Sequence, residues 1–149
     1  MNITGTREFA APPDALWRAL TDPQSVAGIL PAAHDFQVED DGRWRVQVVV
    51  PLGLGTLPLA LTITPEVLAP YREVRYTARG RGTGVLIEVT AELRIASAAT
   101  GSHLSWEASA LLRGAVASIG RHVLDPMVEY QISGFLETLD GHPRATAAG

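Results

Sequence analysis

The stretch Val85-Leu86-Ile87-Glu88-Val89-Thr90-Ala91-Glu92-Leu93-Arg94-Ile95 carries an apolar side chain at every second position. Glutamate, threonine and arginine occupy most of the positions between them. A period of two is typical of a β-strand with one face on the core and one face in water. Glycines at 80, 82 and 84 precede this stretch, and the segment Ala98–Ser102 follows it. We interpret both as turns, so hairpins are predicted to join this strand to its neighbours.

Alternation of the same kind predicts six further strands along the chain. They are expected at residues 2–9, around 36–38, at 43–50, around 57–63, at 73–79 and around 104–110. Asp40-Asp41-Gly42 is a turn signal between two of them. Because hairpins join most of these strands, we predict an antiparallel sheet.

Helices are predicted at both ends of this series of strands. Pro12-Pro13-Asp14 indicates the start of a helix that Thr21-Asp22-Pro23 ends, and a second short helix follows through Ile29. Near the C-terminus, apolar residues from Val116 to Leu139 recur at helical spacing, with a kink expected at Pro126.

This order predicts one α+β domain over residues 1–141, followed by a disordered tail at 142–149. A curved antiparallel sheet of about seven strands would wrap around the long C-terminal helix, with the two short helices after the first strand. Strand faces rich in valine, leucine and isoleucine would then line the space between sheet and helix. We therefore predict an apolar cavity there.

The composition excludes several classes of function. The chain has 149 residues, a formal net charge of −4 and no cysteine, and all 12 basic residues are arginine. The negative charge argues against nucleic acid as the main partner. The lack of cysteine excludes disulfides and thiolate metal sites, and the lack of lysine excludes Schiff-base chemistry. The N-terminus lacks the apolar core of a signal peptide, so we expect a cytoplasmic protein.

The residues that could carry catalysis do not form a recognisable constellation. The histidines at 34, 103, 122 and 142 lack metal-ligand spacing with carboxylates, and no serine lies in a nucleophile elbow. We predict no catalytic residue, no metal and no cofactor. One alternative stays open: His34 and Asp35, near the expected cavity rim, either form an acid–base pair or lie in a solvated loop.

The segment Phe9-Ala10-Ala11-Pro12-Pro13-Asp14-Ala15-Leu16-Trp17-Arg18-Ala19-Leu20-Thr21-Asp22-Pro23, with Gly5 before it and Leu30-Pro31 after it, resembles the N-terminal signature of a known family. That family is CoxG, the G-type subunits of carbon monoxide dehydrogenase, within the START/Bet v 1-like (SRPBCC) superfamily. Gly80-x-Gly82-x-Gly84 ahead of residues 91–94, and the segment Gly120–Asp125, are also similar to it. The resemblance covers residues 2–139.

The resemblance implies a helix-grip fold, an apolar ligand that is lipid- or quinone-like, and an accessory role beside a molybdenum hydroxylase such as carbon monoxide dehydrogenase. It also implies that the protein helps to attach that enzyme to the inner face of the membrane. Two features depart from the family pattern. Members often carry a long C-terminal extension with a membrane-seeking segment, whereas this chain ends soon after Leu139, and the segment 52–61, often lysine-rich in relatives, is strongly apolar here.

Two groups of residues are candidates for binding. For the cavity wall we predict alternating strand residues and residues of the long helix: Trp44, Val48, Leu59, Leu61, Tyr76, Val89, Ala91, Trp106, Val123, Met127 and Tyr130. A filled core is the alternative, because periodicity does not distinguish a cavity wall from packed interior. For a contact surface with a membrane or partner enzyme we predict Leu52, Leu54 and Leu57, since these leucines of one hairpin cannot all point inward.

Three functional hypotheses follow from these observations. The favoured one is a non-catalytic carrier or accessory protein for an apolar small molecule. The second is a cyclase- or dehydratase-like enzyme that acts on a polyketide-like or aromatic substrate. The third is a structural anchor for a partner enzyme. The oligomeric state stays open.

Overall fold

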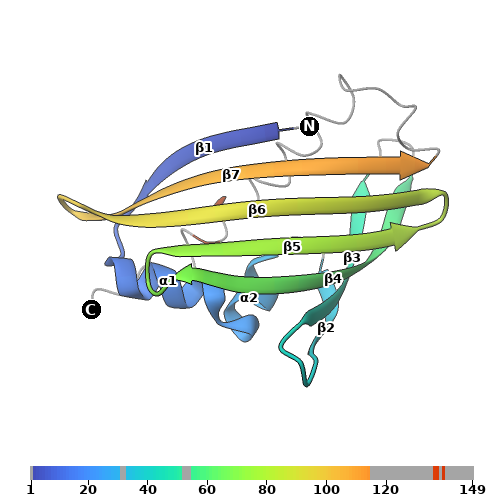
Figure 1. The fold of residues 1–149 in the computed structure, drawn as a ribbon, viewed down its shortest axis with the longest axis horizontal. Helices are drawn as coiled ribbons and strands as arrows, with labels where there is room; N and C mark the ends of the chain where they lie inside the picture. Colours follow the sequence, from blue (N-terminus) through green and yellow to red (C-terminus); the bar gives the residue numbers. More distant parts are fainter. Residues whose placement is uncertain (1, 31–32, 52–54, 115–135, 138, 140–149) are drawn as a thin grey trace.

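The computed structural model describes residues 2–30, 33–51, 55–114, 136–137 and 139. These residues form a sheet and two short helices that lie against one of its faces (Figure 1). The strands are β1 (Asn2–Phe9), β2 (Ala33–Val38), β3 (Trp44–Pro51), β4 (Thr56–Ala69), β5 (Glu73–Gly82), β6 (Val85–Ala98) and β7 (Gly101–Gly114). The helices are α1 (Pro13–Thr21) and α2 (Pro23–Ile29).

The seven strands make one antiparallel, curved sheet in the order β1-β7-β6-β5-β4-β3-β2. Each strand from β2 to β7 pairs with its neighbour in the chain. Strand β1 lies at one edge of the sheet and pairs with β7 from Asn2↔Ser109 to Phe9↔Ser102. The predicted seven-stranded antiparallel sheet with two short helices after the first strand is therefore confirmed. The helices lie at the end of the sheet that carries the β4–β5 turn (Figure 1).

Helices α1 and α2 follow directly from local chemistry. Each has a proline in its first turn, where the missing N–H needs no partner. Asp22 links the two helices: its backbone N–H donates to the carbonyl of Arg18, and its own carbonyl accepts from Val26. The buried face of α1 includes Leu16, Trp17 and Leu20, and it packs on the inner face of the sheet.

The glycines at 80 and 82 are not in a turn, contrary to our prediction. Both lie within β5, and the turn is limited to Thr83 and Gly84. Their role is close packing: a Cβ at Gly80 would lie 2.8 Å from Cγ2 of Ile87, and one at Gly82 would lie 2.6 Å from the carbonyl oxygen of Pro58. Neighbouring strands therefore approach β5 more closely than a side chain at either position would allow.

The connection from β1 to α1 contacts the start of β7 through a hydrogen bond and a close backbone approach. The Ser102 hydroxyl donates a buried hydrogen bond of 2.6 Å to the carbonyl of Ala11. Gly101 has a φ of 151°, and a Cβ there would collide with the carbonyl of Phe9. Because only glycine fits this approach, the N-terminal strand and helix are held in one position relative to the sheet.

Most of the predicted C-terminal helix, Val116–Leu139, lies outside the described residues, as does the predicted tail at 142–149. Leu136, Glu137 and Leu139 are described and are helical. The side chains of Leu136 and Leu139 are buried in the same core cluster as α1. In the part of the chain that the structure describes, no helix is long and apolar enough to cross a membrane.

Tyr76 connects the two hydrophobic clusters of the core. One cluster joins α1 to β5, β6 and β7, the other joins α2 to β3 and β4, and the Tyr76 ring packs against both. Its hydroxyl donates a hydrogen bond to the carbonyl of Leu20 in the last turn of α1. Carbonyls in that turn lack a partner within their helix, so the sheet supplies the bond that the helix cannot.

We expect Tyr76→Phe to lower the free energy of unfolding by about 1–3 kcal/mol, because the change leaves the buried Leu20 carbonyl unpaired. Denaturant unfolding measures this change. Tyr71→Phe is the matched control, since Tyr71 is exposed and lies on the β4–β5 turn; it should change stability by less than about 0.5 kcal/mol. Equal effects of the two substitutions would contradict the proposed role of the Tyr76 hydrogen bond.

Candidate functional site

An apolar cavity of about 240 Å³ lies between the inner face of the sheet and the helices. The helices contribute Leu20, Val26 and Leu30 to its wall. The sheet contributes inward-facing residues of five neighbouring strands: Trp44, Ile63, Tyr76, Ala78, Val89, Ala91, Leu93, Leu104, Trp106 and Ala108. Leu136 completes the described part of the wall.

Small side chains keep this space open. Ala91 of β6 pairs with Ala108 of β7 on one side and with Tyr76 of β5 on the other. Ala78 of β5 lies two residues from Tyr76 on the same face and also borders the cavity. Each of these alanines contributes only a methyl group to the wall, whereas longer aromatic and leucine side chains lie around them.

The cavity wall offers few polar groups. Within the described ranges, no charged side chain borders the cavity, and the polar atoms of its side chains belong to aromatic rings. The Tyr76 hydroxyl is bonded to the Leu20 carbonyl, and burial raises the pKa of Tyr76 above its ordinary value, so the phenol stays neutral. Phe36, Trp44 and Tyr76 form a row of rings, with centroids 5.6 and 5.4 Å apart.

The indole of Trp106 is the exception to this pairing of polar groups. Its Nε1 is buried, and it has no hydrogen-bond partner among the residues that the structure describes. An unpaired buried N–H costs about 1–3 kcal/mol relative to one that keeps its bond to water. The ring lies directly over Gly5, its partner in β1: a Cβ at Gly5 would lie 2.6 Å from Cε2 of the indole.

The sequence-predicted wall residues divide into three groups. Trp44, Tyr76, Val89, Ala91 and Trp106 border the cavity. Val48 and Leu61 pack against the cluster around Trp44, and Leu59 is buried, but none of these three borders the cavity. Val123, Met127 and Tyr130 lie outside the described residues.

Sequence reasoning missed the helix residues of the wall and two of its three alanines. Leu20, Val26 and Leu30 had only the general signal of an apolar helix face, which a filled core would produce equally well. Ala78 and Ala108 did carry a usable signal. Both occupy inward positions of predicted strands, where alanine indicates space that a larger residue would fill.

His34 and Asp35 lie away from the cavity. Nε2 of His34 is 3.9 Å from Oδ2 of Asp35, and the two side chains are 54% and 75% exposed. They border a surface pocket with Gln37, Arg45 and Gln47. Their exposure fits the solvated alternative, and no described group of three histidine, aspartate or glutamate residues could hold a metal ion.

The leucines of the predicted contact surface are only partly described. Leu52 and Leu54 lie outside the described residues, whereas Leu57 is half-buried and pairs with Val50. Strands β3 and β4 remain paired up to Pro51↔Thr56. The apolar hairpin therefore begins at the end of the sheet opposite to α1.

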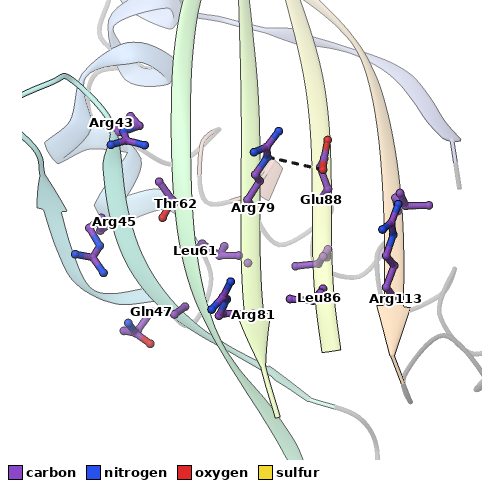
Figure 2. A pocket seen from close by; sticks show the side chains of 14 residues that line it. Arg43, Arg45, Gln47, Leu61, Thr62, Arg79, Arg81, Leu86, Glu88 and Arg113 are labelled. Carbon is purple, nitrogen blue, oxygen red and sulfur yellow. Dashed lines mark ion pairs between the residues drawn. The ribbon is translucent and has the colours of Figure 1, made fainter. Parts of the chain in front are cut away.

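A second hollow, which we call the arginine trough, lies on the outer face of the sheet (Figure 2). Its volume is about 720 Å³, and five arginines border it. Arg43 directly precedes β3, Arg45 lies in β3, Arg79 and Arg81 lie in β5, and Arg113 lies in β7. Arg81, Leu86 and Arg113 lie side by side on β5, β6 and β7. Leu86, which lies between Arg81 and Arg113, is 50% exposed.

The charges in the arginine trough are unevenly compensated. Arg43 pairs with Asp41 at 2.7 Å, Arg45 with Glu39 at 3.5 Å and Arg79 with Glu88 at 3.8 Å. Arg81 and Arg113 make no ion pair within the described ranges of the chain. The trough therefore carries uncompensated positive charge beside the exposed side chain of Leu86.

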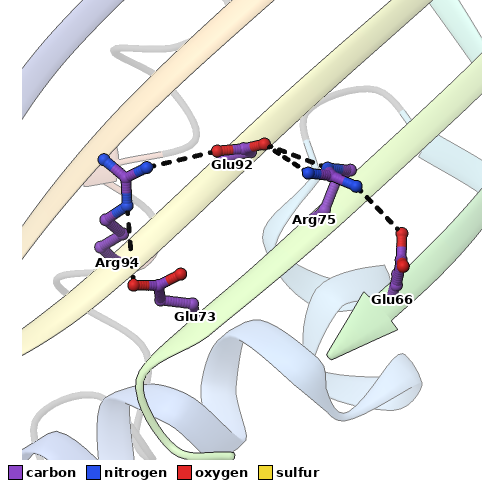
Figure 3. Close-up of polar contacts among 5 residues, drawn as sticks. All are labelled: Glu66, Glu73, Arg75, Glu92 and Arg94. Atoms are coloured by element: carbon purple, nitrogen blue, oxygen red, sulfur yellow. Dashed lines mark hydrogen bonds and ion pairs between the residues drawn. The ribbon is translucent and has the colours of Figure 1, made fainter. Parts of the chain in front are cut away.

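At the opposite end of the outer face, two arginines and three glutamates form a network of ion pairs (Figure 3). Nε and Nη2 of Arg75 both donate to Oε1 of Glu92, at 3.0 and 2.8 Å, and Nη1 donates to Glu66 at 3.3 Å. Arg94 lies 3.4 Å from Glu92 and 3.8 Å from Glu73. The hydrogen bonds that Arg75 donates to Glu92 raise the pKa of the Arg75 guanidinium. Positive charge is therefore concentrated at the trough end.

Comparisons with known proteins agree with this architecture. The sequence model of the CoxG family, the G-type subunits of carbon monoxide dehydrogenase, matches residues 5–141. A comparison with curated protein sequences found no match.

Solved structures with a similar fold come from distant sequences. A conserved protein from Geobacillus kaustophilus has a TM-score of 0.88 at 16% identity, over 95% of this chain and 93% of the other. The Zhui aromatase/cyclase from Streptomyces has a TM-score of 0.73 at 21% identity, over 100% and 98%. A START superfamily protein from Mycobacterium smegmatis has a TM-score of 0.70 at 11% identity, over 94% of each chain.

We expect Gly5→Ala to displace the Trp106 indole and to destabilise the fold by about 1–3 kcal/mol through overpacking. Near-ultraviolet circular dichroism and denaturant unfolding measure the two effects. Gly28→Ala is the control, because a Cβ there meets nothing within 4 Å and the residue lies in α2. That substitution should leave the tryptophan signal unchanged and stabilise the helix by about 0.5–1 kcal/mol. An unchanged signal in both variants would contradict the packing of Trp106 on Gly5.

Proposed function

Because this chain belongs to the CoxG family of carbon monoxide dehydrogenase subunits, we propose that it is a non-catalytic accessory protein that binds an apolar, lipid- or quinone-like small molecule. The observation that carries the proposal is the cavity of about 240 Å³, whose described wall contains no charged side chain. Apolar concavities with few polar groups are the usual binding sites for such molecules. Inward-facing alanines keep the cavity open at positions where a larger residue would fill it.

The chemistry of the wall favours binding over catalysis. General acid–base catalysis needs a titratable group within hydrogen-bond reach of the substrate. In the described wall the titratable group is Tyr76, whose hydroxyl is occupied by Leu20 and whose pKa is raised. Aromatase/cyclase activity belongs to one structural neighbour by name. No observation in this cavity favours it here.

We further propose that residues 116–139 form the long helix of a helix-grip fold and close the cavity. The described end of this segment supports the proposal, because Leu136 borders the cavity and Leu139 is buried beside α1. A helix with apolar residues at the spacing of Val123, Met127 and Tyr130 would turn one face toward the sheet.

The contact surface of this proposal combines the apolar hairpin, residues 52–57, with the arginine trough. Ala60 pairs with Arg81, so the trough adjoins the base of the hairpin at one end of the sheet. Leucines beside arginines suit a membrane interface, where apolar side chains enter the lipid and guanidinium groups meet anionic headgroups. We propose that this end contacts the inner face of the membrane, where the protein assists a molybdenum hydroxylase such as carbon monoxide dehydrogenase.

We expect Ala91→Leu to weaken the binding of phenylnaphthylamine, a neutral fluorescent probe for apolar cavities, by about tenfold or more. The added side chain would occupy the cavity, and forcing a ligand into a filled site costs about 1–3 kcal/mol. Fluorescence titration measures the affinity, and mass spectrometry of solvent extracts from the purified protein identifies any natural ligand.

Ala96→Leu is the matched control, since Ala96 lies on the same strand but is exposed on the outer face. It should leave probe binding unchanged, and both variants should unfold at wild-type denaturant concentrations or above. Failure of the wild-type protein to bind the probe, or equal binding by both variants, would contradict the cavity as the ligand site.

For the contact surface, we expect the double change Arg81→Gln and Arg113→Gln to weaken association with phosphatidylglycerol vesicles about 20- to 30-fold. The estimate follows from about 1 kcal/mol per arginine at an anionic surface. Vesicle flotation measures the bound fraction. The double change Arg18→Gln and Arg72→Gln removes the same charge from the opposite end of the molecule and should have a much smaller effect.

The change of Leu52 and Leu54 to serine tests the apolar part of the same surface. It should weaken vesicle association without lowering the free energy of unfolding. Lower stability with unchanged association would assign the hairpin to the core. Equal losses in the two arginine double variants would contradict a localised surface.

A further inference from the structure

The arginine trough contains two arginines whose charge is not compensated. Five arginines and one glutamate border the trough. Three of these arginines pair with a carboxylate, whereas Arg81 and Arg113 make no ion pair within the part of the chain that the structure describes. Both residues are exposed. A ligand with two negative charges would therefore balance the charge that the described residues leave uncompensated.

The register of the sheet sets the spacing of these two arginines. Arg81 of β5 pairs with Leu86 of β6, and Leu86 pairs with Arg113 of β7, so the arginines lie two strands apart on the outer face (Figure 2). Because neighbouring strands lie about 4.8 Å apart, the Cα atoms of Arg81 and Arg113 are separated by roughly 10 Å. This spacing suits two anionic groups that are held at a fixed distance from each other.

Apolar side chains occupy the space between the two arginines. Leu86 lies between them and is exposed, and the exposed Leu111 of β7 also borders the trough. A single phosphate shared by Arg81 and Arg113 would lie over Leu86 and lose part of its hydration to an apolar group, which is unfavourable. Two phosphates joined by a short carbon bridge would instead place the bridge over Leu86 and one phosphate beside each arginine.

We propose that the trough binds one anionic lipid whose headgroup contains two bridged phosphates, with one phosphate at Arg81, the other at Arg113 and the bridge over Leu86. The inference rests on the proposed membrane contact and adds the class of lipid. A guanidinium group can donate two parallel hydrogen bonds to one phosphate, so each arginine is sufficient for its own phosphate. A lipid is favoured over a free diphosphate, because it also covers Leu86 and Leu111, which a free anion would leave in water.

Cardiolipin and phosphatidylglycerol are suitable probes for the full chain. Both present phosphodiester groups on glycerol, but in cardiolipin two phosphates belong to one molecule. Each lipid is mixed into phosphatidylcholine vesicles at the same number of anionic phosphates, and vesicle titration measures the two affinities. The wild-type protein should bind cardiolipin vesicles about 5- to 10-fold more tightly, because the second phosphate arrives with the first. The ratio of affinities removes contacts that both vesicles provide equally, such as those of the apolar hairpin.

The change Arg113→Gln should lower this ratio to about 1, since Arg81 alone needs one phosphate. Arg43→Gln is the matched control: Arg43 borders the same trough, and its loss changes the net charge equally, but it pairs with Asp41 at 2.7 Å. Its ratio should equal that of wild type. A ratio of about 1 in the wild-type protein, or equal losses in both variants, would overturn the proposal. Binding of neither vesicle by the wild-type protein would instead overturn the proposed membrane contact itself.

Soluble pyrophosphate distinguishes a lipid headgroup from a free diphosphate. Added to the protein on cardiolipin vesicles, it should release no more protein than sodium chloride at the same ionic strength, because it would act only by screening charge. Release by pyrophosphate at an ionic strength where sodium chloride releases none would assign the trough to a soluble diphosphate and overturn the lipid assignment.

Discussion

The hydrogen bond from the Tyr76 hydroxyl to the Leu20 carbonyl sets the distance between the helices and the sheet. It satisfies a carbonyl at the end of α1 that has no partner within the helix, and it does so across the full length of a tyrosine side chain. Ala78 and Ala91, which lie beside Tyr76 on the inner face, are too short to span the same distance. The described cavity lies over these short side chains.

The two faces of the sheet differ in their chemistry. Alternation places the apolar cavity on the inner face and the charged side chains on the outer face. The register of the sheet then determines which charged side chains lie next to one another on the outer face. Glu66, Arg75 and Glu92 fall in one row and compensate one another, whereas Arg81, Leu86 and Arg113 fall in a row near the opposite end. An apolar cavity and a positively charged outer surface are therefore built from the same strands in alternation.

Close approaches at glycine matter more to this molecule than glycine turns. Gly5 gives the Trp106 indole its place on β1, Gly80 and Gly82 admit neighbouring strands to β5, and Gly101 admits the backbone of Phe9. In each case a Cβ would collide with a neighbour. Relatives of the fold at 11–21% identity retain its overall shape, which agrees with a fold that depends on alternation and a few close contacts more than on individual side chains.

The sequence by itself determined the strands, the two short helices and the division between inner and outer faces, because periodicity and proline placement are local properties. It identified Trp44, Tyr76 and Trp106 as inward-facing, but it could not distinguish a cavity from a filled core. It also misplaced Gly80 and Gly82 in a turn, since a glycine needed for close packing and a glycine needed for a bend look the same in one chain. Only the tertiary structure decided that Tyr76 bonds to Leu20, that the Trp106 indole packs on Gly5 and that Leu86 lies between Arg81 and Arg113. Each of these depends on contacts between segments that lie apart in the chain, and no local pattern encodes such contacts.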